Sequence, residues 1–88
     1  MTYPVTVSET AARQLRKLSE KDNRRVIRGL DVLREDSLRP RPKADIRPLA
    51  ATEPRKFRLR IGEYRPVYAV LGNEVRIIEV FIRGRGYR

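Results

Sequence analysis

The sequence predicts a single α+β domain, residues 1–88, in which a two-helix hairpin packs on one face of a four-stranded, mostly antiparallel sheet. Two periodicities indicate this fold. Apolar residues recur at every second position near both ends of the chain, as in half-buried strands, and at spacings of three and four between residues 9 and 36, as in amphipathic helices. The predicted order is an N-terminal strand, two helices, a linker and a three-stranded antiparallel meander.

Residues 2–7 are expected to form the first strand. Its apolar residues Tyr3, Val5 and Val7 alternate with Pro4 and Thr6. Pro4 has no amide hydrogen to donate to a neighbouring strand. The first strand is therefore expected at an edge of the sheet.

Two short helices should follow, and each begins after a serine. Ser8 and Ser19 are expected to act as N-caps, whose hydroxyls accept hydrogen bonds from unpaired amides. Asp22 follows Ser19 at the spacing of a capping box. The apolar side chains expected to face the core are Ala11, Ala12, Leu15, Leu18, Val26, Ile27, Leu30 and Leu33. The basic residues on the opposite faces favour solvated surfaces over a DNA-reading helix.

Residues 37–54 are expected to form a linker without regular structure. Prolines interrupt helix and strand throughout it, at Pro40, Pro42, Pro48 and Pro54. Ile46 and Leu49 should pack locally. The basic side chains of the linker indicate a solvated loop, although a loop beside a nucleic-acid groove would have the same composition.

The stretch from Lys56 to Arg88 should contain the meander. Gly62-Glu63 and Gly72-Asn73 are turn-forming pairs between strand-like runs. With a two-residue turn at the first pair, Ile61 faces Tyr64, and the register of the first two strands is set.

This register gathers arginines on the solvated face of the sheet. Arg60 lies opposite Arg65, Arg58 lies opposite Val67, and Arg76 from the last strand is expected to join them. Like charges across a ladder are unfavourable by up to about 1 kcal/mol. Two readings stay open: the guanidinium groups spread into water, or a phosphate bridges them with paired hydrogen bonds.

The composition excludes several kinds of chemistry. Twenty-one Lys and Arg against eleven Asp and Glu give a net charge of +10, which favours a polyanionic partner, nucleic acid first, then an acidic protein or an anionic membrane. Without cysteine or histidine, a thiol nucleophile, a disulfide and the usual general base are excluded. The scattered carboxylates predict no metal site, and no cofactor is expected. No apolar run approaches the roughly 20 residues needed to span a bilayer, and no signal peptide is evident, so a cytoplasmic protein is expected.

The meander resembles the RelE/ParE family of toxins from toxin–antitoxin pairs. The residues that carry the resemblance are Phe57-Arg-Leu-Arg-Ile-Gly-Glu-Tyr-Arg-Pro-Val-Tyr68, followed by a last strand that ends in Ile82-Arg-Gly-Arg-Gly-Tyr87. Chain length, charge, the N-terminal strand, the helical hairpin and the Pro-rich linker also agree. The resemblance implies a ribosome-dependent endoribonuclease that cleaves mRNA in the A site, needs no metal ion and is silenced by an acidic antitoxin.

The resemblance also implies the site residues. Catalytic roles are expected for Arg58, Arg60, Arg65, Arg83, Arg85 and Tyr87, with either Arg83 or Arg85 as the terminal catalytic arginine. RNA-binding roles are expected for Lys56, Arg47 and Arg76. Arginine is never deprotonated in proteins, so the general base is not evident from these residues. Lys56 is one candidate, and a base from solvent or the ribosome is another.

Two other functions stay open. A ParE-like toxin would inhibit a type II topoisomerase and cleave nothing, but that branch usually lacks the complete basic set. A non-catalytic nucleic-acid-binding module would need only the positive charge.

Overall fold

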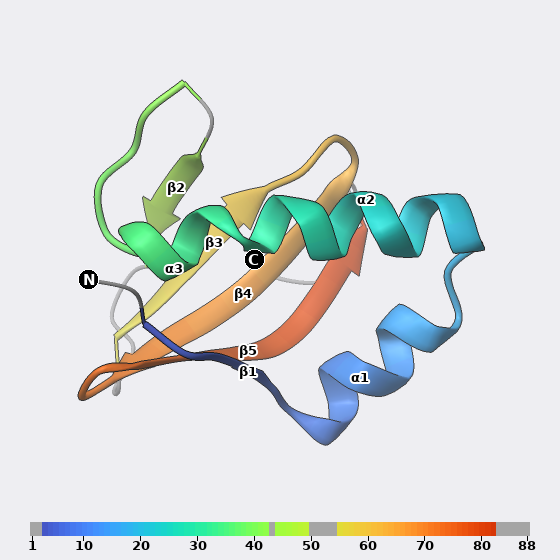
Figure 1. The fold of residues 1–88 in the computed structure, drawn as a ribbon, viewed down its shortest axis with the longest axis horizontal. Helices are drawn as coiled ribbons and strands as arrows, with labels where there is room; N and C mark the ends of the chain where they lie inside the picture. Colours follow the sequence, from blue (N-terminus) through green and yellow to red (C-terminus); the bar gives the residue numbers. More distant parts are fainter. Residues whose placement is uncertain (1–2, 43, 50–54, 83–88) are drawn as a thin grey trace.

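The computed structural model describes residues 3–42, 44–49 and 55–82 (Figure 1). Its elements in chain order are β1 (Val5–Val7), α1 (Glu9–Arg16), α2 (Glu20–Leu30), α3 (Val32–Glu35), β2 (Asp45–Pro48), β3 (Lys56–Arg60), β4 (Tyr64–Leu71) and β5 (Glu74–Ile82). This order confirms the predicted α+β class. No helix in the described ranges is long and apolar enough to cross a lipid bilayer.

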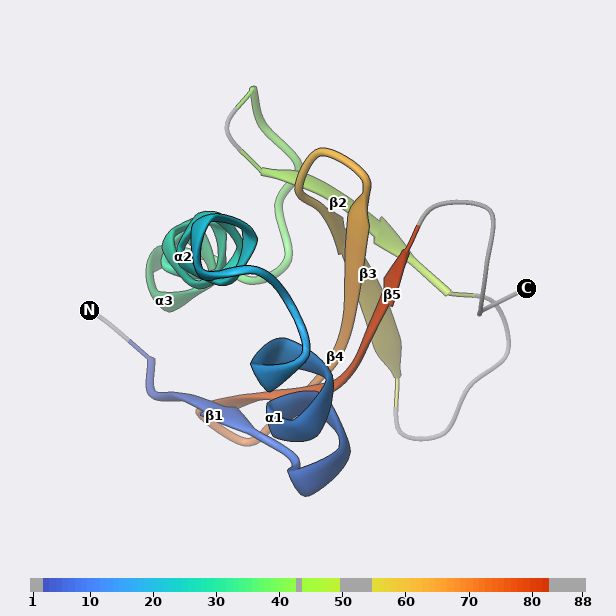
Figure 2. The ribbon, with the colours of Figure 1, turned by 90° about the vertical axis from the view of Figure 1, so that its right-hand side faces the viewer.

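One sheet runs through the molecule in the order β1-β5-β4-β3-β2 (Figure 1). β1 pairs with β5 in parallel, and all other neighbours are antiparallel. The helices lie on one face of this sheet (Figure 2). Gly62 and Gly72 adopt positive φ values of 59° and 62° in the two predicted turns, a conformation that costs glycine little. The edge position of β1 is also confirmed.

The sheet has five strands where four were expected. β2 forms inside the Pro-rich linker and pairs with β3, with Ile46 opposite Leu59. Ile46 is only 2% exposed and belongs to the main core, so local packing of the linker was the wrong prediction. β2 lies at the sheet edge, where Pro48 can end the strand without breaking a ladder on its outer side.

The helices begin where the sequence indicated. The Ser8 hydroxyl accepts a hydrogen bond of 3.0 Å from the Ala11 amide, and the Ser19 hydroxyl accepts one of 3.1 Å from the Asp22 amide. The predicted core residues Ala11, Leu15, Val26, Leu30 and Leu33 are buried. Ile27 is 44% exposed, contrary to expectation, because it lies about 100° around α2 from Val26.

α1 covers the edge of β5 that β1 leaves open. β1 pairs only with residues 75–77 of β5. Beyond them, the side-chain oxygen of Gln14 accepts a 2.6 Å hydrogen bond from the Val80 amide, and the Ser8 hydroxyl donates a 2.6 Å bond to the Ile78 carbonyl. These side chains satisfy backbone groups that a longer β1 would otherwise pair.

A β-bulge interrupts the ladder between β4 and β5. Val67 pairs with Glu79 and the next residue, Tyr68, pairs with Ile77, so Ile78 is the extra residue. Side chains alternate across a strand, and an inserted residue reverses the alternation beyond it. Both Ile77 and Val80 therefore reach the core, and Glu79 lies on the opposite face.

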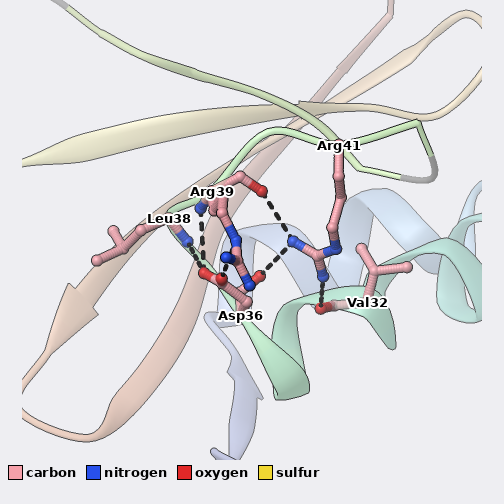
Figure 3. A network of polar contacts seen from close by, with 5 residues as sticks. All are labelled: Val32, Asp36, Leu38, Arg39 and Arg41. Atoms are coloured by element: carbon pink, nitrogen blue, oxygen red, sulfur yellow. Dashed lines mark hydrogen bonds and ion pairs between the residues drawn. The ribbon is translucent and has the colours of Figure 1, made fainter.

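A polar network fixes the turn that follows α3 (Figure 3). The Asp36 carboxylate accepts hydrogen bonds from the Leu38 and Arg39 amides, which hold the pKa of the Asp36 carboxyl below its usual value. The Arg41 guanidinium donates to three backbone carbonyls, including that of Val32 at 2.8 Å. The same turn is tied to the sheet, because the buried Tyr68 hydroxyl donates a 2.5 Å hydrogen bond to the Ser37 carbonyl.

Replacing Tyr68 by Phe should lower the free energy of unfolding by about 1–2 kcal/mol, because the buried Ser37 carbonyl then loses its donor. In thermal denaturation this corresponds to a melting temperature lower by about 5–10 °C. Tyr3→Phe is the matched control, because Tyr3 is exposed. Equal melting temperatures for the Tyr68 variant and the wild type would show that the bond does not stabilise the fold.

Tyr68 should also contribute to the alkaline limit of stability. Burial raises the pKa of its hydroxyl well above the usual range, so the folded state favours the neutral form. The contribution of Tyr68 to the free energy of unfolding is complete below the unfolded-state pKa of about 10. It is lost as the pH rises above that value, because the unfolded tyrosine then ionises while the folded one stays neutral. Urea titrations from pH 9 to 11.5 should show a shallower loss of stability for Tyr68→Phe than for the wild type.

Candidate functional site

The face of the sheet opposite the helices carries the predicted basic residues. We call it the arginine face and define it by Arg47, Arg58, Arg60, Arg65 and Arg76. The strand registers order the face into rows, because directly paired residues point to the same side of a sheet.

The central row crosses four strands. Arg47 on β2 pairs with Arg58 on β3, Arg58 pairs with Val67 on β4, and Val67 pairs with Glu79 on β5. Val67 is buried, so the row places an apolar residue between a guanidinium and a carboxylate.

A neighbouring row contains the two facing arginines. Arg60 pairs with Asp45 on β2, and Arg65 pairs with Phe81 on β5. Arg58 pairs with Val67, and Ile61 pairs with Tyr64 beside the first turn, both in the predicted register. Arg60 and Arg65 lie between these two pairs, so Arg60 lies opposite Arg65. The predicted register of the first two meander strands is therefore confirmed.

Arg58 is buried, at 8% exposure, whereas it was expected to be solvated. Its Nη1 atom lies 3.5 Å from the Asp45 carboxylate and 3.4 Å from the Asp45 backbone carbonyl oxygen. The carboxylate comes from the unpredicted strand β2, which explains the error. Because the charge of Arg58 already has a partner, the side chain is held in one place on the face.

Arg65 is the least satisfied cation of the face. Its Nη1 atom is fully buried and has no hydrogen-bond partner among the described residues. Leaving a buried donor unpaired costs about 1–3 kcal/mol, and more when the group is charged. A guanidinium can only donate, so an oxygen of a bound anion would complete this site.

The remaining predicted residues differ in their surroundings. Arg47 and Arg60 are exposed, and Lys56 lies on the arginine face opposite Ala69. Arg76 lies on the same face and forms an ion pair of 3.6 Å with Glu74. The C-terminal candidates Arg83, Arg85 and Tyr87 lie outside the described residues, so their roles stay predictions.

Sequence reasoning missed two carboxylates of this face, Asp45 and Glu79. Asp45 lies in the segment that was expected to be a linker without regular structure. Glu79 depends on the bulge at Ile78, and the consecutive isoleucines at 77 and 78 were the only sign that the alternation breaks there. Within the described ranges, no group of three carboxylates lies close enough to hold a metal ion.

The helical side has a second basic region. A hollow of about 770 Å³ along α2 is lined by Glu20, Lys21, Arg24, Arg25, Arg28 and Gly29. Arg24 is already paired with Glu20, one turn away. No buried unpaired donor among the described residues belongs to this hollow, in contrast to Arg65.

Solved structures of RelE proteins share this fold. The chain is 30% identical to a chain of the archaeal RelE–RelB complex from Pyrococcus horikoshii OT3, with a TM-score of 0.80, covering 98% of this chain and 100% of that one. It is 27% identical to a chain of the RelBE2 toxin–antitoxin complex from Mycobacterium tuberculosis, with a TM-score of 0.74, covering 94% and 100%.

The isolated Escherichia coli RelE toxin is similar in fold, with a TM-score of 0.61 at 24% identity, over 96% of this chain and 87% of that chain. No protein-family model matches the sequence, and no curated protein is significantly similar to it.

If the arginine face binds phosphates, Arg60→Ala should weaken binding of a single-stranded RNA oligonucleotide. It should also reduce the slope of log affinity against log salt by about 0.7, because one fewer counterion is released. Arg34→Ala is the control, since exposed Arg34 lies on α3 beside Asp31. Fluorescence anisotropy over a salt series measures both quantities. Identical slopes for the two variants would argue against contact at Arg60.

Proposed function

Because the chain belongs to the RelE family of toxins, we propose that it is a type II toxin that cleaves mRNA in the ribosomal A site. The reaction is metal-independent, it inhibits translation, and it takes place in the cytoplasm, where mRNA and ribosomes meet. The observation that carries this proposal is the buried Nη1 donor of Arg65, which has no hydrogen-bond partner within the described ranges, on a face that also holds Arg58 and Arg60.

The reaction suits a site made of arginines. RNA cleaves itself when a 2′-hydroxyl attacks the adjacent phosphorus, provided that the atoms are aligned and the extra negative charge of the phosphorane is neutralised. Arg65 offers a donor that is already desolvated, and a desolvated donor interacts more strongly with developing charge than one in water. Arg58 is held by Asp45 beside it, and exposed Arg60 can turn toward the phosphate.

The C-terminal residues complete the proposed site. Either Arg83 or Arg85 would add a further guanidinium, and Tyr87 would stack on a base and orient it. Arg47, Lys56 and Arg76 would hold the RNA backbone on either side of the scissile phosphate.

The proposed partner is an acidic antitoxin that folds on binding. Two of the similar structures are RelE–RelB complexes, and a protein of net charge +10 attracts an acidic chain. Two surfaces suit such a partner. One is the arginine face, and the other is an apolar hollow of about 330 Å³ between α1 and the sheet, lined in part by Leu18, Tyr64, Val80 and Ile82. Purification from native cells without a small acidic protein would count against this partner.

Arg65→Ala should abolish cleavage in a cell-free translation reaction whose mRNA ends are mapped by primer extension. Loss of one donor to the developing charge should lower the cleavage rate by about 100-fold to 1,000-fold. The affinity for RNA should fall only modestly, because the interaction is strongest in the transition state. Arg65→Lys keeps the charge without the paired donors, so its cleavage rate should lie between those of the wild type and Arg65→Ala.

Arg34→Ala serves as the unaffected control. Cuts that require translating ribosomes and vanish in Arg65→Ala would support the nuclease. Intact mRNA with folded wild-type protein would contradict it and favour a ParE-like inhibitor of a topoisomerase. Equal losses of binding and cleavage in Arg65→Ala would instead favour a nucleic-acid-binding module.

A further inference from the structure

We infer that Glu79 is the general base that removes the 2′-hydroxyl proton, an inference that rests on the nuclease function proposed above. The reaction needs such a proton acceptor. The chain has no histidine, and arginine cannot serve because it is always protonated. Besides Lys56, Tyr87 and a base from solvent or the ribosome, the protein can offer a carboxylate on the arginine face as the acceptor.

Glu79 occupies the right place on the face. It shares its row with Arg58, and the two are separated only by Val67 on the strand between them. Two strand spacings place the Cα atoms of Arg58 and Glu79 about 10 Å apart. Arg65 is the diagonal neighbour of Glu79 across β4 and β5, at about 7–8 Å. A phosphate bound between the two arginines would thus have its adjacent ribose within reach of the Glu79 carboxylate.

Glu79 also differs from the other carboxylates of this face. Asp45 pairs with Arg58, whereas Glu74 accepts a 2.5 Å hydrogen bond from the Thr6 hydroxyl and pairs with Arg76. Glu79 is half-buried, and within residues 3–42, 44–49 and 55–82 the structure records no hydrogen bond or ion pair to its side chain. Its oxygens are therefore available to accept a proton.

The bulge at Ile78 is what brings Glu79 to this face. With strict alternation from exposed Arg76, residue 79 would point toward the helices and into the core. A charged group there would need a partner, and the core cluster around Ile77 and Val80 is apolar. The extra residue instead gives the core two apolar side chains and gives the arginine face a carboxylate.

The Glu79 carboxylate takes the proton of the 2′-hydroxyl while the 2′-oxygen forms a bond to phosphorus. The bond from phosphorus to the 5′-oxygen breaks, and this oxygen leaves with the bonding electrons and takes a proton from water. The products are a 2′,3′-cyclic phosphate and a 5′-hydroxyl end, and protonated Glu79 returns its proton to solvent.

The test is single-turnover cleavage of mRNA on programmed ribosomes with saturating protein, measured from pH 5 to 9. Glu79→Gln keeps the shape of the side chain and removes the base, so the rate should fall at least about 100-fold. The rise of the rate with pH on the acid side should also disappear. Binding to ribosomes that carry mRNA with a 2′-deoxy scissile nucleotide should be unchanged or tighter. Glu79→Asp should retain the pH dependence at a reduced rate.

Glu63→Gln is the matched control, because it removes the same charge from an exposed turn. Lys56→Gln tests the competing base. The inference is overturned if Glu79→Gln cleaves like the wild type, if it loses binding as much as cleavage, or if the acid-side pH dependence disappears in Lys56→Gln instead. In those cases wild-type cleavage still supports the nuclease. Wild-type protein that cleaves nothing would overturn the nuclease function and Glu79 together.

Discussion

The pairing of β3 with β4 is the constraint on which both faces of the sheet depend. The bridge between Ile61 and Tyr64 sets this register at the tight turn. A shift of one residue would turn Phe57 and Leu59 away from the helices and bury the arginines in their place. Burying several unpaired guanidinium groups is far more costly than any turn. The requirement for a core therefore also determines where the positive charge gathers.

The arginine face is held together by partial compensation of its charges. Arg58 has a carboxylate beside it, whereas Arg65 keeps a buried donor for which the described part of the chain provides no partner. Full compensation would stabilise the free protein but would leave nothing to attract an anion. The arrangement holds one guanidinium in place and leaves another with an unused donor, and this division of roles suits the phosphate site proposed above.

Local sequence determined much of this structure. The two serine caps, the turn glycines and the β3–β4 register follow from interactions between residues close in the chain, and all were predictable. β2 was not, because Ile46 becomes a strand residue only through pairing with Leu59, thirteen positions away. The burial of Arg58 and the outward position of Glu79 were missed for a related reason. Each depends on how distant strands pair, and no local pattern reports that.

The position of β1 has a consequence for when the arginine face can form. Val5 pairs with Val75, so the beginning of the chain finds its place only beside the last described strand. α1 is anchored to that same strand by Ser8 and Gln14. A nascent chain that lacks β5 therefore has no partner for its N-terminal strand, and its sheet is incomplete. The ribosome that makes this protein should therefore have synthesised β5 before the complete arginine face exists.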